Sequence, residues 1–192
     1  MKKLFVLLFA ASAALTSFKA TAQDTWTADK AHSKLGFSIT HMMVSDVEGS
    51  FRSFESTILS SKPDFSDAVV NLSADVNSVN TEDDKRDGHL KSADFFDAEK
   101  YPKLTFKSTS VKKVSANKYK VNGNLTLHGV TKAVVLDAVL RGTTVNQAKK
   151  TVAGFKVTGT LKRADYALGA KYPNAMLSDE IILTANTEFV KN

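Results

Sequence analysis

The feature that most constrains this chain is a two-residue alternation of apolar and polar side chains that recurs along most of its length. Because successive side chains of a β-strand point to opposite faces, each such segment predicts a strand with one apolar and one polar face. The pattern predicts about eight or nine strands. They cover residues 25–28, 34–41, 51–59, 68–76, 104–109, 118–128, 134–140, 155–162 and 181–189.

One apolar and one polar face per strand is typical of antiparallel sheets with one wet side. The short connections near Asn117 and Gly142–Asn146 favour an up-and-down order. We therefore expect an all-β fold, a closed antiparallel barrel of about eight strands, whose interior is filled by side chains or holds one small ligand. A two-sheet sandwich produces the same alternation, and periodicity alone does not separate the two.

One connection, from Asn77 to the strand that begins near Leu104, is far longer than the others. Hairpin loops usually have two to five residues, so a connection of this length is more often functional. It opens with acidic residues, continues with Arg86, Asp87 and His89, and ends with aromatic residues that include Phe95 and Phe96. This mixture predicts a lid over an apolar space, with at least one of the two rings turned towards the barrel. The alternative is that both rings are ordinary core.

The same connection carries local helix signals. Thr81 is a candidate N-cap, and the acidic residues 82–84 would occupy a first turn, where the helix dipole favours negative charge. We expect a short helical excursion over Glu82–Lys91 and a second short turn from Ser92.

The N-terminus has the three parts of a secretory signal peptide. Met1–Lys3 is basic, Leu4–Leu15 is apolar, and Ala20 and Ala22 are the small residues of a cleavage site. We expect residues 1–22 to be removed and the mature chain, 23–192, to form one domain in the periplasm. The apolar run is about 12 residues long, too short to span a bilayer comfortably.

Charge and cysteine content narrow the function classes. The chain has 26 Lys and Arg against 20 Asp and Glu; without Lys2, Lys3 and Lys19 the basic residues number 23, a net charge of only +3. With no Cys, disulfides, thiolate catalysis and Cys-based zinc sites are excluded.

The lysines fall mostly on polar strand faces, which predicts a solvated exterior or transient contact with a membrane surface. No nucleic acid is expected as a partner, because exposed aromatic residues do not interleave with the basic ones.

Specific residues, in order along the whole mature chain, resemble the YceI-like polyisoprenoid-binding proteins. They are Trp26, Asp29, His32–Ser33, Phe37, His41, Gly49, Phe51, Ser78–Thr81, Arg86–Asp87, His89–Leu90, Ser92, Asp94–Phe96, Tyr101–Pro102, Phe106, Ser108, Gly123–Thr131, Gly154–Phe155 and Arg163–Tyr166. The resemblance implies an exported, lipocalin-like barrel whose apolar cavity takes a long isoprenoid chain. This chain departs from the family pattern at Tyr166–Ala167, where the family often has an aromatic residue followed by Gly, and in the segment 168–177 after it.

The inward faces of the expected strands, together with the two loop phenylalanines, supply the candidate ligand-binding residues. These are Leu35, Phe37, Ile39, Val70, Leu72, Phe95, Phe96, Leu104, Phe106, Leu125, Leu127, Leu136, Phe155, Val157, Leu161, Ile181 and Leu183. We expect one continuous tunnel, lined by Phe37, Leu72, Phe106, Leu127, Phe155 and Leu183. Burying one five-carbon isoprene unit contributes roughly 3–4 kcal/mol, so a few units suffice for micromolar binding despite the entropic cost of association.

Polar candidates for a ligand headgroup, or for ordering the loops, are Arg86, Asp87, His89, Arg163 and Asp165. Arg163 and Asp165 are expected to form a charge pair that closes one barrel end. The four histidines form no metal-binding motif; His32 and His128 are expected to bond backbone groups in turns. No nucleophile motif is present either.

We therefore expect no catalytic residue, no metal and no cofactor. The prediction is a binding protein for a long-chain isoprenoid, a polyprenyl lipid or an isoprenoid quinone. Two alternatives stay open: an enzyme acting on a lipid or quinone, and a filled barrel that serves as a stress or interaction protein. The sequence does not determine the oligomeric state.

Overall fold

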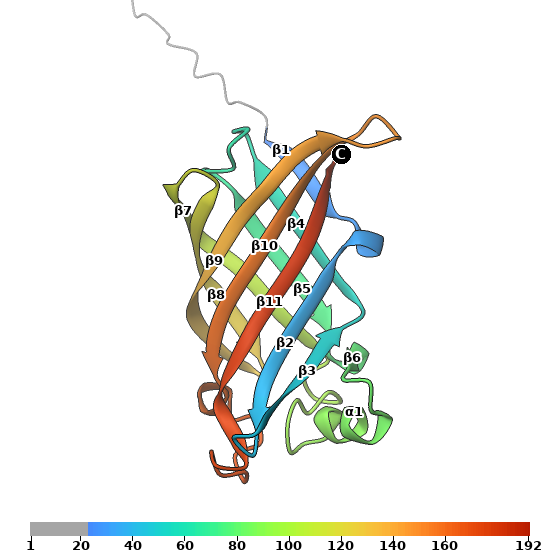
Figure 1. Cartoon of the computed structure of the whole chain (residues 1–192), viewed down its shortest axis with the longest axis vertical. Helices are drawn as coiled ribbons and strands as arrows, with labels where there is room; N and C mark the ends of the chain where they lie inside the picture. The colour runs from blue at the N-terminus through green and yellow to red at the C-terminus, as the bar shows by residue number, and fades with distance from the viewer. Residues whose placement is uncertain (1–22) are drawn as a thin grey trace, which may run out of the picture.

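The computed structural model describes residues 23–192, so the expected signal peptide lies outside the described residues. Eleven strands form one antiparallel sheet that closes into a barrel (Figure 1). The strands are β1 (Asp24–Ala28), β2 (Lys34–His41), β3 (Ser45–Phe51), β4 (Phe54–Ser60), β5 (Val69–Asp75), β6 (Val79–Asn80), β7 (Lys103–Ser115), β8 (Lys118–Leu127), β9 (Val130–Val145), β10 (Thr151–Lys162) and β11 (Leu177–Lys191). The helices are α1 (Asp84–Lys91) and the 3-10 helices η1 (Lys30–His32), η2 (Val76–Ser78) and η3 (Arg163–Tyr166).

The closed ring runs β1–β4–β5–β7–β8–β9–β10–β11 and back to β1, so it contains eight strands. β11 is long enough to pair with β1 near its C-terminal end and with β2 along the rest of its length. β3 pairs with β2, and β6 with β3, which extends the wall towards the end of the barrel opposite the termini (Figure 1). The expected closed, up-and-down antiparallel barrel is confirmed.

The strand expected over 51–59 is interrupted, and this prediction is corrected. β3 ends at Phe51 and β4 begins at Phe54. The intervening N–H groups of Arg52 and Ser53 donate to the carbonyl and the hydroxyl of Ser78, at 3.0 and 2.9 Å. Ser78 thus accepts the hydrogen bonds that a neighbouring strand would otherwise accept from this segment. Most of β3 was not among the expected strands, although Val47, Gly49 and Phe51 alternate.

The long connection leaves the wall where β6 ends and returns at β7. Within residues 23–192, β6 pairs with β3 alone, and α1 lies beside it at the lower end of the barrel in Figure 1. The helix begins later than expected, because Asp83 rather than Thr81 is its N-cap: the Asp83 carboxylate accepts from the N–H of Arg86 at 2.9 Å. Residues from Ser92 form the expected turn, with the N–H of Phe95 bonded to the Ser92 carbonyl at 3.1 Å.

The other end of the barrel, next to the termini, is closed by an aromatic plug. The Phe65 ring packs edge-on against Trp26 and Phe155, with ring centroids 5.1 and 5.2 Å apart. Asp67 holds the plug loop by accepting from Ser60 Oγ at 2.5 Å and from the Ser61 N–H at 2.9 Å. Burial by itself would raise the pKa of Asp67, but these hydrogen bonds outweigh it and hold the pKa below the usual value. Among residues 23–192, no helix is long and apolar enough to cross a bilayer.

Candidate functional site

Two adjoining cavities occupy the barrel interior. The upper one, below the aromatic plug, has a volume of about 160 Å³, and the lower one, beside α1, has about 290 Å³. Four residues border both: Phe37, Phe51, Leu104 and Leu183. For scale, a protein cavity of about 150 Å³ holds one benzene molecule. The interior is therefore partly hollow, and a long ligand would have to occupy both cavities.

All of the apolar residues expected to bind ligand border one or both cavities. Leu35, Val70, Leu72, Phe106, Leu125, Leu136, Phe155 and Val157 border the upper cavity. Ile39, Phe95, Phe96, Leu127, Leu161 and Ile181 border the lower one, and Phe37, Leu104 and Leu183 border both. The single tunnel that we expected takes the form of two adjoining cavities that share four bordering residues.

Two large side chains of the interior reach into space that glycines of the wall leave free. A Cβ atom on Gly49 would sit 2.3 Å from the Phe37 ring, and one on Gly123 would sit 2.3 Å from the Phe106 ring. Each ring thus fills the space of a missing methyl group on a nearby strand. The sequence signal was a glycine at an inward strand position, which we did not interpret.

Polar groups border the lower cavity, near the end of the barrel that carries α1. Three of the expected headgroup candidates, Arg86, His89 and Arg163, lie there together with Thr81 and Tyr172. Asp87 and Asp165 do not border either cavity. The site is therefore amphiphilic, with an apolar interior and polar atoms at one end.

Arg86 and Asp87 fix the loop before α1 instead of pairing with each other. The buried Asp87 carboxylate accepts from the N–H and the hydroxyl of Thr81 at 2.8 and 2.6 Å. Arg86 donates through Nε to the Thr81 hydroxyl and through Nη2 to its carbonyl, both at 2.7 Å. Thr81 is thus held from two sides, which places the Arg86 guanidinium at the lower cavity.

Arg163 does not form the expected charge pair, and that prediction is wrong. Its side chain is buried, with 4% exposure, whereas Asp165 is exposed. The guanidinium donates to the carbonyls of Leu168, Gly169 and Tyr172 at 2.7, 2.6 and 3.0 Å. It thereby folds the segment after η3 around itself. A buried arginine that donates to backbone carbonyls and to the Asn174 side-chain oxygen organises a loop, a role that the Arg-x-Asp spacing did not indicate.

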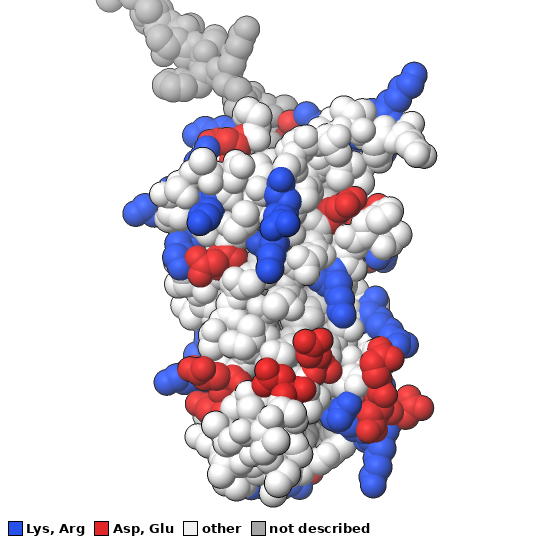
Figure 2. Space-filling model, in the orientation of Figure 1, with Lys and Arg blue, Asp and Glu red and all other residues white. Residues whose placement is uncertain are grey.

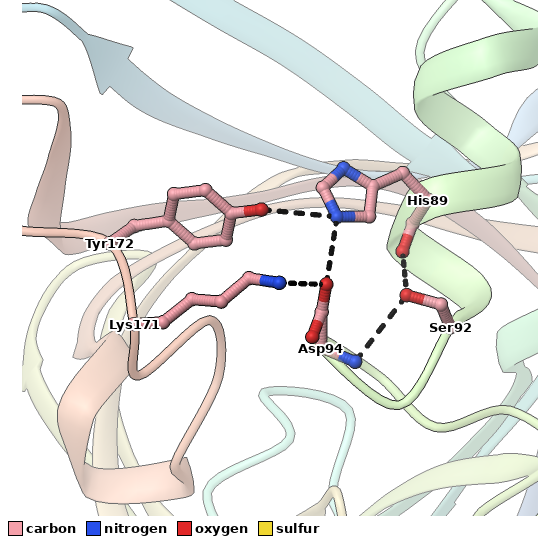
Figure 3. A network of polar contacts seen from close by, with 5 residues as sticks. All are labelled: His89, Ser92, Asp94, Lys171 and Tyr172. Carbon is pink, nitrogen blue, oxygen red and sulfur yellow. Dashed lines mark hydrogen bonds and ion pairs between the residues drawn. The ribbon is translucent and has the colours of Figure 1, made fainter.

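A polar latch joins the two loops at the mouth of the lower cavity (Figure 3). His89 Nε2 lies 3.2 Å from both Asp94 Oδ2 and the Tyr172 hydroxyl, and Lys171 pairs with the same carboxylate oxygen. The Phe95 ring stacks on Tyr172, with ring centroids 5.3 Å apart. Hydrogen bonds from Lys171 and His89 hold the pKa of Asp94 below 3.8, and the Asp94 partner raises the pKa of Lys171. Apart from His89 and Phe95, we did not anticipate the latch residues.

Phe95 and Phe96 have different roles. Both are buried, but Phe96 belongs to the main hydrophobic core and packs edge-on against Phe51, with ring centroids 5.7 Å apart. Phe95 packs on the latch residues Tyr172 and His89 instead. Only Phe95 therefore matches the expected lid, and Phe96 matches the core alternative.

The remaining histidines lie outside this site or on its edge. His128 Nδ1 bonds the Tyr166 carbonyl at 2.9 Å, as expected of a turn residue. His32 instead bonds the Asp29 carboxylate at 2.8 Å, and this contact raises the pKa of His32. Asp29, His32 and Glu188 bring their ligand atoms within 4.8 Å on the outside of the barrel. The His32–Asp29 hydrogen bond and the backbone bond from the Asp29 N–H to the Glu188 carbonyl, at 2.8 Å, account for their closeness, so we assign no metal to them.

Comparison with known proteins gives the chain a family. Residues 26–189 match the YceI-like domain. The chain belongs to the YceI-like family. A UPF0312 protein of Staphylococcus aureus is 36% identical over 169 residues, covering 85% of this chain and 96% of that protein. A UPF0312 protein of Pectobacterium atrosepticum is 39% identical over 152 residues, 79% of each chain.

Two solved structures share the fold. The Campylobacter jejuni YceI protein superposes with a TM-score of 0.74 at 36% identity, covering 85% of this chain and 96% of that one. A polyisoprenoid binding domain from Saccharophagus degradans has a TM-score of 0.63 at 20% identity, covering 87% and 98%. The second likeness concerns the barrel alone, because the two sequences have diverged so far.

Proposed function

We propose that this YceI-like protein binds a long-chain isoprenoid or a similar amphiphilic lipid, such as a polyprenyl lipid or an isoprenoid quinone, and carries it in the periplasm. The observation that carries the proposal is the pair of adjoining apolar cavities, of which only the lower one is bordered by the ionisable side chains of Arg86, His89 and Arg163. The likeness to a domain described as polyisoprenoid binding supports it. The signal-peptide pattern of residues 1–22 supports the location.

The size of the cavities favours a long, thin ligand. Small-molecule sites usually have volumes of roughly 300–1,000 Å³, and each cavity is below that range. A flexible tail can occupy both cavities, past the bordering residues that they share, whereas a compact ligand has to fit within one of them. Each isoprene unit buried there contributes roughly 3–4 kcal/mol.

The polar mouth fits the headgroup of such a lipid. Arg86 and His89 border the lower cavity, and Lys171 lies in the same latch. These donors suit an oxygen-rich group such as a hydroxyl, a phosphate or a quinone carbonyl. Binding would then orient the ligand with its tail towards the aromatic plug and its headgroup between the two loops.

The enzyme alternative receives less support from the site. General acid–base or nucleophilic chemistry needs polar side chains that converge on one reacting atom. The polar groups at the mouth largely bond one another or the loop backbone, as in the contacts of Arg163 and Asp94. We therefore assign the site to binding.

The test is ligand identification followed by a blocking substitution. The mature protein is purified from the periplasm, its organic extract is analysed by mass spectrometry, and the delipidated protein is titrated with polyprenols of increasing length. Leu183→Trp fills the wall that both cavities share, so we expect it to weaken polyprenol binding at least about tenfold. Ile182→Trp is the matched control, because the neighbouring Ile182 is 40% exposed. An empty extract, together with no binding of any polyprenol, would refute the proposal.

A further inference from the structure

The turn between β2 and β3 exposes an unusual run of large apolar side chains. Met42, Met43 and Val44 are 58%, 69% and 84% exposed, and Met176, on the loop before β11, is 46% exposed. We call these four residues the apolar tip. Tight hairpin turns usually carry Gly, Asn or Asp, so three consecutive apolar residues at a turn need another explanation.

The backbone holds the apolar tip in place. The Met42 N–H donates to the Met176 carbonyl at 2.8 Å, which ties the turn to the loop before β11. The Val44 N–H closes the turn on the His41 carbonyl at 3.0 Å. Met42 and Met43 both have left-handed backbone angles, φ 51° and 57°, which disfavour residues with a side chain. The structure thus retains large apolar side chains at two positions where glycine would be less strained.

The apolar tip is continuous with the mouth of the lower cavity. Met176 and His41 border that cavity, and Met42 follows His41 directly. In Figure 1 the β2–β3 turn and the loop before β11 lie side by side at the end of the barrel away from the C-terminus. A surface that covers the tip therefore also covers the opening through which a lipid tail would pass.

The charge distribution shows what kind of surface fits there. In Figure 2, most Lys and Arg side chains lie along the upper and middle parts of the visible face, a group of acidic side chains lies below them with further basic side chains at its sides, and the lowest lobe is largely uncharged. Lysines 112, 113, 149 and 150 lie in or near the turns that follow β7 and β9, away from the tip. The nearest acid in sequence, Asp46, bonds the Thr40 hydroxyl at 2.8 Å. An uncharged tip with a group of acidic side chains behind it suits the acyl-chain boundary of a bilayer and not a layer of anionic headgroups.

We propose that the apolar tip inserts into the acyl-chain boundary of a lipid bilayer and docks the mouth of the lower cavity on the membrane. A lipid tail then moves between bilayer and barrel without crossing water. This inference rests on the proposed lipid-binding function, but it concerns a different surface. The contact is hydrophobic, so it needs no anionic lipid and depends little on salt.

The experiment measures docking and lipid binding separately. Mature protein is floated with vesicles of pure zwitterionic phosphatidylcholine, in low and in high salt. The test variant is Met42→Ser/Met43→Ser/Val44→Ser. The control variant is Val114→Ser/Val135→Ser/Val145→Ser, whose residues are 51%, 55% and 62% exposed and lie away from the tip. A second assay titrates each delipidated variant with a polyprenol presented in detergent.

We expect the wild type and the control variant to float with the vesicles at either salt concentration. The partition coefficient of the tip variant into the vesicles should be lower by about tenfold or more. All three should bind detergent-presented polyprenol equally, while transfer from vesicles slows only for the tip variant. Equal flotation of tip variant and wild type would overturn the inference. So would failure of the wild type to float with these zwitterionic vesicles, or a wild-type dimer in light scattering that the tip variant loses. Docking without any polyprenol binding would refute the proposed function and leave the docking surface standing.

Discussion

The ring of Phe37 lies against the backbone of Gly49 on the adjacent strand, and both cavities border this ring. Phe37 and Gly49 are directly paired in the β2–β3 ladder, so they face the same part of the barrel interior. At the scale of single residues, the volume of the interior therefore depends on which wall positions lack a side chain.

Gly49→Ala should narrow the passage between the two cavities. The new Cβ would lie 2.3 Å from the Phe37 ring, which must then turn into the interior. We expect the free energy of unfolding to fall by about 1 kcal/mol and polyprenol affinity to fall about tenfold. Gly154→Ala is the control, because its nearest neighbour would be 3.7 Å away. Titration with polyprenol and chemical denaturation of both variants measure the two effects. Equal polyprenol affinities would contradict the role assigned to Gly49.

Ala167 follows η3 with a left-handed φ of 54°. This is the position at which the chain departs from the glycine expected from the family pattern. A left-handed conformation costs an L-residue roughly 1–2 kcal/mol, and glycine avoids most of that cost. We expect Ala167→Gly to raise the free energy of unfolding by about 1 kcal/mol. Ala170→Gly, in the same loop, should not raise the free energy of unfolding. Urea denaturation measures both, and a loss of stability in Ala167→Gly would contradict the argument.

At the scale of elements, two loops decide access to the lower cavity. The turn after α1 brings Asp94 and Phe95, and the loop before β11 brings Lys171 and Tyr172. Arg163 holds the second loop through its carbonyls. The two loops meet through the latch, so opening the mouth requires these contacts to separate.

Single substitutions of the two loop phenylalanines should have different effects. Phe96→Ser removes a core ring and should lower the free energy of unfolding by about 3–5 kcal/mol. Phe95→Ser removes the stacking on Tyr172 and should cost less, about 2 kcal/mol. Only Phe95→Ser should mainly accelerate polyprenol release, because it opens the mouth. Melting curves and dissociation rates measured together test this; identical stability losses would contradict the division between core and lid.

The latch should weaken in acid. The contacts of Asp94 with Lys171 and His89 lower the pKa of this carboxyl in the folded protein. The ionised Asp94 carboxylate therefore stabilises the latch fully above the ordinary pKa of 3.8. This stabilisation is lost as the pH falls through the lower pKa that Asp94 has in the folded protein. We expect polyprenol release to be slow and constant from pH 5 to 8 for the wild type and to accelerate in stronger acid.

Asp94→Asn should release ligand quickly already at neutral pH and lose the acid dependence. The control is Asp64→Asn, at the closed end, where pairing with Lys113 lowers the pKa of Asp64 to about 2. This control should keep slow release at neutral pH. If both variants release ligand at the wild-type rate, the latch does not govern the mouth.

At the scale of the whole molecule, the hollow interior predicts that cargo stabilises the barrel. A ligand present at a hundred times its Kd adds about 2.7 kcal/mol to the free energy of unfolding. For a chain of this size, that corresponds to a rise in Tm of about 5–10 °C. Calorimetry of delipidated and polyprenol-loaded protein measures the shift. Leu183→Trp should show little of it, and an unchanged Tm for loaded wild type would contradict cargo inside the barrel.

The sequence by itself determined most of the strands and their faces, because alternation is a local property and one face of each wall strand had to be buried. Each apolar residue assigned to the interior from alternation, from Leu35 to Leu183, borders a cavity. The helix after Thr81 was also predicted, but it begins two residues later than expected, because Asp83 caps it in place of Thr81. Family-specific motifs added the expectation of a hollow barrel.

Only the tertiary structure decided barrel over sandwich, the division of the interior and the latch. Closure depends on β11 pairing with β1, and the two cavities depend on which rings meet which glycines across strands. Tyr172 and His89 are 83 residues apart in sequence, and Arg163 binds carbonyls whose positions depend on a loop without regular structure. These contacts follow from long-range register, which no local pattern encodes, so they could be found only once the chain was folded.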